Sequence, residues 1–256
     1  SGIQCWRVCF RDLSLMCDVK TIEISENMRV VLNRIAKCVS NHPPPRLVAV
    51  SKTKPVELIQ RLYDDGHRHF GENYVRDLVE KADQLPNDVQ WHFIGHLQRN
   101  KCKQLLALNN LFIIETVDST KLAIQLNKEC EKLKRERINV FVQINTSGET
   151  SKFGVSRSEC VEMVQFIIDT CPRLHFKGLM TIGTSNSRNC MLTLVSCRSD
   201  VSSRLNIPES EIELSMGMSA DFELAIELGS TNVRLGSILF GPRSVPRQTS
   251  TSSPVR

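Results

Sequence analysis

The chain of 256 residues is 41% hydrophobic and 24% charged, which is typical of a folded globular protein and excludes a chain that is disordered throughout. No apolar run approaches the roughly 20 residues that span a bilayer, so we expect no membrane segment. The net charge of +5 is modest, and the densest basic run, 132–137, is interrupted by a glutamate at an expected helix end. This run therefore indicates a solvated helix end rather than a nucleic-acid interface.

The ten cysteines occur singly, without a Cys-x-x-Cys pair, and Cys130 and Cys160 take apolar positions of expected helices. This usage is typical of free thiols in a reducing compartment. Residues 1–20 lack a convincing signal-peptide core, so the cytosol is the expected location, with mitochondrial targeting as the alternative. We expect residues 1–21 to form a flexible N-terminal extension.

The first predicted element is a helix over residues 22–40, which stops at the prolines of 43–45. We expect it to pack outside the main fold or to close one end of it. Its apolar residues fall on one side at helical spacing, and they are Ile24, Met28, Val31, Leu32, Ile35 and Val39.

From residue 46 onward, short β-branched runs alternate with amphipathic stretches, as parallel strands linked by crossover helices do. Eight such units predict a single (β/α)₈ TIM barrel over residues 22–243, followed by a disordered Ser/Thr/Pro-rich tail over 244–256. The predicted strands are 46–51, 68–71, 90–94, 111–115, 138–144, 174–180, 211–215 and 232–235.

Several helices between these strands carry their own signals. The spacing of Val75, Leu78 and Ala82 predicts a helix with one buried face, and Phe222 and Ala225 repeat the pattern later in the chain. Two helix starts are also marked, by the capping box of Ser156 and Glu159 and by Ser119 ahead of an apolar run.

Lys52 closes the first predicted strand, at the end of the barrel where active sites lie. The period-2 rule places it on the same side as Val48 and Val50. If that side is the barrel interior, apolar walls lower the pKa of the amine and free it to attack an aldehyde. Alone, a lysine at a strand end is more often an ordinary surface residue.

The loops after the seventh and eighth strands resemble the phosphate site that many barrels build there. Gly217 and Gly236 allow close backbone approach, and Ser219 offers a hydroxyl and an amide to an anion. Each residue has a plainer role as well, since Ser219 suits a helix N-cap and the glycines suit turns.

A lysine after strand one and a phosphate site after strands seven and eight would face each other across the barrel mouth, at a separation that suits a pyridine ring with an aldehyde and a phosphate. Arg234 would then reach the ring nitrogen, keep it unprotonated and weaken the ring as an electron sink. A structural salt bridge is the competing role for Arg234.

Two further segments would frame such a ring. Asn73 closes strand two, and the polar loop that ends at Lys152 follows strand five, so either would supply hydrogen bonds to the ring oxygen. His92 and His96 lie four apart on a strand and its loop, a spacing that does not favour a zinc site.

Over residues 46–243 these features are similar to those of a known family, the pyridoxal phosphate homeostasis proteins, relatives of the N-terminal barrel of alanine racemase. The resemblance lies in seven stretches in the right order: AVSKTKP (49–55), FGENYV (70–75), WHFIGHLQ (91–98), INTSGETSKFG (144–154), GLMTIG (178–183), ELSMGMSADFE (213–223) and GSTNVRLGSILFG (229–241).

The resemblance implies that pyridoxal 5′-phosphate (PLP) forms a Schiff base with Lys52 and that Arg234 lies at the pyridine nitrogen. It places Ser219, Gly236 and Ser237 around the phosphate. It also places Asn73, Met180 and Lys152 near the ring, the last where alanine racemase has an arginine.

The resemblance further implies a monomeric carrier or regulator of PLP without established turnover, with apo forms of PLP enzymes as partners. The alternative is a PLP-dependent amino-acid racemase or lyase. Two-base racemisation needs a second acid/base opposite Lys52, which alanine racemase takes from a further domain that we do not find in this sequence. A barrel without any cofactor, acting as a binding scaffold, is a third reading.

Overall fold

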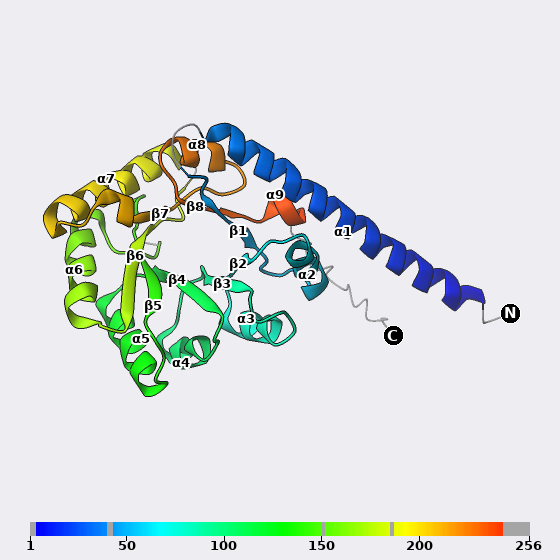
Figure 1. The fold of residues 1–256 in the computed structure, drawn as a ribbon, viewed down its shortest axis with the longest axis horizontal. Helices are drawn as coiled ribbons and strands as arrows, with labels where there is room; N and C mark the ends of the chain where they lie inside the picture. Colours follow the sequence, from blue (N-terminus) through cyan, green and yellow to red (C-terminus); the bar gives the residue numbers. More distant parts are fainter. Residues whose placement is uncertain (1–3, 40–42, 150–151, 185–186, 243–256) are drawn as a thin grey trace, which may run out of the picture.

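The computed structural model describes residues 4–39, 43–149, 152–184 and 187–242. Eight parallel strands pair in chain order and close into a barrel, in which β1 pairs with β8 (Figure 1). The predicted (β/α)₈ barrel is therefore confirmed, and each predicted strand overlaps an observed one. The strands are β1 (Arg46–Val50), β2 (His69–Glu72), β3 (Gln90–Phe93), β4 (Leu111–Val117), β5 (Ile138–Gln143), β6 (Leu174–Met180), β7 (Glu213–Ser215) and β8 (Asn232–Leu235).

Helices connect these strands on the outside of the barrel. The predicted helix starts are confirmed: Ser119 accepts a hydrogen bond from Leu122 N, and Ser156 and Glu159 form the capping box. Across the described ranges, none of the helices has the length and apolar character needed to cross a membrane. The helices are α1 (Gln4–Cys38), α2 (Val56–Asp64), α3 (Val75–Ala82), α4 (Cys102–Leu106), α5 (Thr120–Lys132), α6 (Cys160–Thr170), α7 (Ser187–Leu205), α8 (Phe222–Glu227) and α9 (Ser237–Phe240), with 3₁₀ turns η1 (Arg99–Lys101), η2 (Arg157–Glu159) and η3 (Glu209–Glu211).

Helix α1 packs on α2, α8 and α9 and begins at Gln4, well before the predicted start at residue 22. No Gly or Pro interrupts the chain between these two positions, so nothing in the sequence ends the helix earlier. Its predicted inner face is correct for Ile24, Val31 and Ile35, which are buried, but wrong for Leu32, which is 48% exposed. Leu32 falls one position beyond the buried stripe, which repeats at three and four residues.

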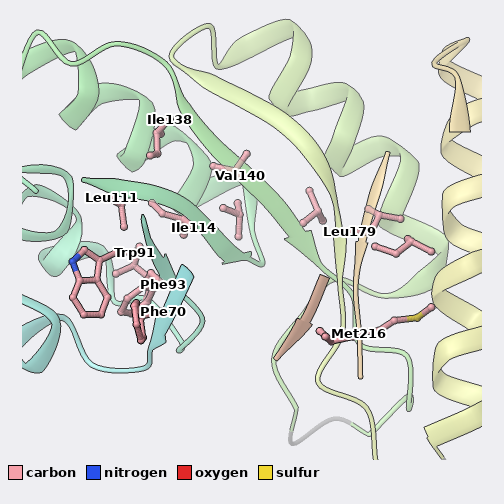
Figure 2. Packing of buried hydrophobic residues seen from close by; sticks show 14 of the residues in the cluster. Phe70, Trp91, Phe93, Leu111, Ile114, Ile138, Val140, Leu179 and Met216 are labelled. Carbon is pink, nitrogen blue, oxygen red and sulfur yellow. The ribbon is translucent and has the colours of Figure 1, made fainter. Parts of the chain in front are cut away.

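The main hydrophobic core lies between the sheet and the surrounding helices (Figure 2). Strand side chains alternate: Ile114 and Val140 point into this layer, whereas Ile113 and Phe141 form a small separate cluster with Met180. This second cluster fills part of the barrel interior, where Val48 and Ile94 are also buried. The rest of the interior carries buried polar and charged side chains, and they lead to the site.

Candidate functional site

A cavity of about 320 Å³ opens where β1, β2, β6, β7 and β8 end. Parallel strands bring their carboxyl ends to one rim, so side chains far apart in the sequence meet there. Apolar groups of Val50, Ile94 and Met218 form part of the wall. Seven of the eight predicted site residues line the cavity: Lys52, Asn73, Met180, Ser219, Arg234, Gly236 and Ser237.

Lys52 is carried by a tight turn after β1, in which Lys54 N donates to Ser51 O at 3.0 Å. Thr53 adopts φ 63°, a left-handed conformation that is strained for a β-branched residue. The Lys54 Nζ donates to the backbone carbonyls of Phe240 (3.1 Å) and its two successors, so this neighbouring amine holds the end of α9. Both lysines line the cavity, and Lys54 is in addition tied to the end of α9.

A buried ion pair holds the same turn from below. Lys81 Nζ lies 2.6 Å from Glu72 Oε1 and 2.9 Å from Ser51 O, and Ser51 Oγ donates to Glu72 Oε1 at 2.6 Å. Burial raises the pKa of Glu72, although Lys81 and Ser51 act against this shift. This pair was not predicted from the sequence. Its signal was Lys81 itself, a lysine on the apolar face of α3, three residues after Leu78.

The loops after β7 and β8 come together around Ser219. Its Oγ accepts from the backbone N–H of Gly236 (3.4 Å) and of Ile238 (3.3 Å), both long for such bonds. Gly217 has φ 95°, and a Cβ there would lie 2.5 Å from that of Ala225, so this turn requires glycine. Two amides thus converge on one oxygen atom at the edge of the cavity.

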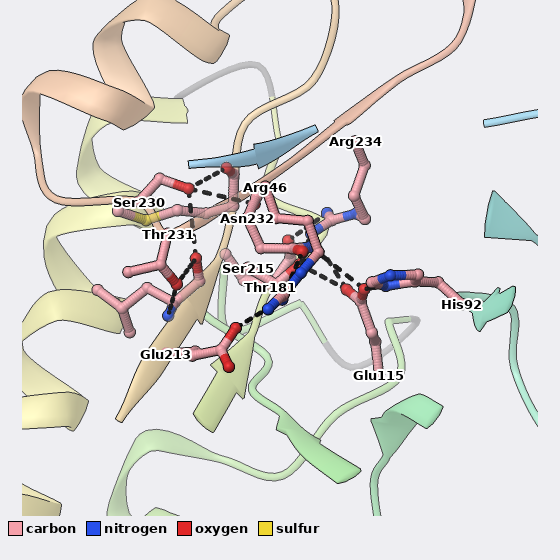
Figure 3. Close-up of polar contacts among 12 residues, drawn as sticks. Arg46, His92, Glu115, Thr181, Glu213, Ser215, Ser230, Thr231, Asn232 and Arg234 are labelled. Atoms are coloured by element: carbon pink, nitrogen blue, oxygen red, sulfur yellow. Dashed lines mark hydrogen bonds and ion pairs between the residues drawn. The ribbon is translucent and has the colours of Figure 1, made fainter. Parts of the chain in front are cut away.

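Arg234 lies in β8 with its side chain buried and its guanidinium at the cavity wall. Its Nη1 donates to Ser215 Oγ at 2.6 Å and its Nη2 to Thr181 O at 2.7 Å (Figure 3). Burial lowers the pKa of Arg234, while the charge of Glu115 acts to raise it. An arginine stays protonated in spite of such burial, so the cavity wall carries a fixed positive charge.

Glu115 in β4 balances this charge from the middle of the barrel (Figure 3). Its carboxylate accepts from Ser215 Oγ at 2.5 Å and from Asn232 Nδ2 at 3.2 Å, and His92 Nδ1 lies 2.6 Å away. Burial raises the pKa of Glu115, but the hydrogen bonds and nearby positive charge outweigh burial and lower it overall. Arg234 therefore takes part in the salt bridge that was its competing role and also faces the cavity.

Glu115 and Ser215 were assigned no role from the sequence. The signal was present in β4, where Glu115 is the one charged residue of an otherwise apolar strand with Thr116 beside it. Its partner could not be found in the same way, since β4 and β7 face each other only once the barrel closes.

Lys152 does not line the main cavity. Its Nζ lies 3.1 Å from Glu149 Oε1, and the residue borders a neighbouring hollow of about 170 Å³ that also touches Thr181 and Ile182. Ile182 contributes to both spaces, so Lys152 lies beside the site rather than in it.

The two histidines considered for zinc lie in different environments. His92 is inside the barrel, and burial lowers its pKa in spite of Glu115. His96 stacks on Phe153 with ring centroids 3.7 Å apart, and this contact joins the loops that follow β3 and β5. Within the described residues, no group of three or more His, Cys, Asp or Glu is arranged to hold a metal ion.

Comparison with known proteins gives matches over most of the chain. The family model described as "Alanine racemase, N-terminal domain" matches residues 23–244. The "Pyridoxal phosphate homeostasis protein" of Homo sapiens is 47% identical over 239 residues, which cover 86% of this chain and 87% of the human protein. The resemblance predicted from the motifs is confirmed.

Solved structures of similar fold include proteins of the same two kinds. PipY of Synechococcus elongatus with PLP bound is 28% identical, with a TM-score of 0.71 over 85% of this chain and 100% of PipY. Alanine racemase of Clostridium difficile 630 has a TM-score of 0.65 at 17% identity, over 86% of this chain and 58% of the racemase. The second likeness concerns the fold alone.

Proposed function

The chain belongs to the alanine racemase N-terminal domain family, and we propose that within it this protein is a PLP-binding protein of vitamin B6 homeostasis. PLP would be held in the cavity at the barrel mouth as a Schiff base on Lys52. The relatives' name and the PLP bound to PipY support this assignment.

The observation that carries the proposal is that one cavity gathers three complementary groups. Lys52 offers an amine, the amides around Ser219 offer donors for a phosphate, and Arg234 offers a donor for a ring nitrogen. The volume of about 320 Å³ suits a small ligand.

Two features inside the site fit a ligand of this kind. Asn73 Oδ1 is buried at the cavity and has no hydrogen-bond partner among the described residues, although such atoms are nearly always paired. The amides of Gly236 and Ile238 make only long hydrogen bonds to a neutral hydroxyl. An anion would satisfy these amides better, and a bound ring with a hydroxyl group would supply a donor to Asn73.

When bound, PLP supplies an aldehyde and a phosphate, and the chain's own residues would place both. The Ser51–Lys54 turn presents Lys52, the loops after β7 and β8 receive the phosphate, and Val50, Ile94 and Met180 exclude water from the ring. Lys54 is the less suitable amine because its ammonium already donates to the end of α9.

We further propose that the protein carries PLP rather than turning over amino acids. Of the described residues that line the cavity, Lys52, Lys54 and Arg234 are the ones with ionisable side chains. Among the described residues, the cavity lining thus offers no carboxylate, imidazole, thiol or phenol opposite Lys52 as a second acid/base. Arg234 also favours an unprotonated pyridine, which is a poor electron sink.

The visible absorption spectrum of the purified protein with PLP tests the binding proposal. We expect a Schiff-base band in the parent and in Lys54→Ala. Lys52→Ala should show no such band, because the Lys54 ammonium donates to backbone carbonyls at the end of α9. A Schiff-base band of parental strength in Lys52→Ala would refute the assignment to Lys52.

Two assays test the carrier proposal. Incubation with L- or D-alanine should give no racemisation above that of free PLP, whereas the loaded protein should reactivate an apo PLP enzyme. Racemisation that saturates with alanine and disappears in Lys52→Ala would overturn the proposal. Failure to reactivate any apoenzyme would leave storage or sensing as the role.

A further inference from the structure

Glu115 is a carboxylate with 0% exposure in the middle of β4, and it does not line the cavity. A buried charge is costly unless it is paired and hydrogen-bonded. A barrel interior is ordinarily filled by apolar side chains, as the Ile113–Phe141–Met180 cluster fills part of this one. The charge of Glu115 must therefore be compensated by its contacts inside the barrel.

The contacts of Glu115 lead in one direction to the cavity wall. Ser215 Oγ donates to Glu115 Oε2 at 2.5 Å and accepts from Arg234 Nη1 at 2.6 Å, so one hydroxyl bridges the two charges, which lie 4.0 Å apart. Asn232 Nδ2 donates to both Glu115 and Ser215 and fixes the bridge from the side. The backbone carbonyl of Thr181 holds the other end of the guanidinium at 2.7 Å.

We propose that Glu115 is a positioning residue for PLP: through the Ser215 hydroxyl, it fixes the Arg234 guanidinium at the place of the pyridine nitrogen. The inference rests on the proposed function. Two anchors, Ser215 and Thr181 O, set the plane of the guanidinium, and Glu115 supplies the counter-charge that keeps this cation stable in the barrel. Its remaining N–H groups are then available to the ring nitrogen, which accepts a hydrogen bond and stays unprotonated.

A purely structural role for Glu115 makes a different prediction. Glu115 also contacts His92 and Asn232, so its loss would disturb the barrel core in any case. A general disturbance weakens every ligand of the cavity equally. A positioning role weakens those ligands that have a ring nitrogen and spares those that lack one.

Equilibrium binding of two ligands separates these roles: PLP, and its 1-deaza analogue, in which C–H replaces the ring nitrogen. A hydrogen bond to a charged group is worth about tenfold or more in affinity, so the parent should prefer PLP by about that factor. In Glu115→Gln and in Ser215→Ala, PLP affinity should fall until the two ligands bind within about twofold of each other, since the 1-deaza analogue never used Arg234.

Glu72→Gln is the matched control. Glu72 is equally buried, at 0% exposure, and also accepts from a serine and pairs with a cation, Lys81, but it holds the turn of Lys52 instead. This variant should weaken both ligands by the same factor and keep the preference for PLP. Loss of that preference in Glu72→Gln would overturn the inference, because any buried carboxylate would then have the same effect.

The double variant Glu115→Gln with Arg234→Gln guards against misfolding, since it leaves no unpaired charge in the barrel. If Glu115 acts through Arg234, the double variant and Arg234→Gln alone should show the same lack of preference. A full preference for PLP in Glu115→Gln, or an equal loss for both ligands, would overturn the inference. A parent that binds neither ligand would overturn the proposed function, and this inference with it.

Discussion

The two sides of the barrel sheet differ in kind. On the outer side, strands and helices bury a continuous apolar layer that includes Phe70, Trp91 and Ile114. On the inner side, a three-residue apolar cluster shares the space with a buried polar network centred on Glu115 and Arg234. The outer layer supplies hydrophobic free energy to folding, whereas the inner network costs desolvation.

This difference indicates that the two sides of the sheet have different roles. A layer that only stabilises the fold needs apolar side chains of suitable size. Charges placed inside the barrel are retained at a cost, and here they lead to the cavity through Arg234. Substitutions on the outer side should therefore change stability, and those on the inner side should change ligand binding as well.

The largest expected effect comes from two adjacent isoleucines on β4. Ile114 points into the outer layer and Ile113 into the inner cluster, and both are buried. Ile114→Ala should lower the free energy of unfolding by about 2–5 kcal/mol through the cavity that it leaves, without changing PLP affinity at temperatures where the protein is folded. Ile113→Ala should also weaken PLP binding, because its neighbour Met180 lines the cavity.

Urea denaturation and PLP titration of the two variants make this measurement. Equal PLP affinities in Ile113→Ala and Ile114→Ala would show that the two sides of the sheet do not differ in function.

A smaller effect should depend on pH at the other end of the barrel. Burial lowers the pKa of His67 to about 4 and of His69 to about 3, and His69 Nδ1 lies 3.0 Å from His92 Nε2. Below about pH 6.5 the unfolded chain binds protons that the folded protein excludes, so the free energy of unfolding should fall as the pH drops from about 6.5 to 4.

Urea denaturation between pH 7.5 and 4.5 checks this effect in the parent and in His69→Gln, which should lose less stability over the interval. His96→Gln is the control, because this histidine is 41% exposed at the opposite end of the barrel and should leave the loss in place. An identical pH dependence in the parent and in His69→Gln would contradict the assignment.

The smallest effect concerns the phosphate site, where each contact is a single hydrogen bond. Ser219→Ala combined with Gly236→Val should reduce the preference for PLP over pyridoxal by about tenfold while leaving the barrel folded. The valine side chain would occupy space beside Val50, at the cavity wall. Ser156→Ala, in the capping box before α6, serves as control. A full preference in the double variant would place the phosphate site elsewhere.

Much of this architecture could be predicted from the sequence, because the signals are local. Alternation and helical spacing gave all eight strands, and the position of Lys52 after the first strand followed from the barrel rule. The rest depends on contacts between distant segments. Ser215 meets Glu115 across the closed barrel, and Lys81 reaches Ser51 from α3, so neither pairing has a signature in local spacing.

The start of α1 and the place of Lys152 were less predictable for other reasons. A helix extends through any stretch that lacks Gly and Pro, and apolar spacing alone does not mark where it begins. Lys152 lies in a loop whose conformation is set by its own hydrogen bonds, such as those that Asn145 Nδ2 donates to Glu149 O and Lys152 O. The motif therefore brought the loop to the right region but did not determine where its lysine points.

The most direct test of the central claim is borohydride reduction of the protein mixed with PLP, followed by peptide mapping of the labelled lysine. Reduction makes the bond between lysine and cofactor permanent, so the label reports which amine reached the aldehyde. We expect the pyridoxyl group on Lys52, since the family resemblance assigns the Schiff base to this residue and Lys54, although it also lines the cavity, donates to the end of α9. A label mainly on Lys54 or Lys152 would contradict the account.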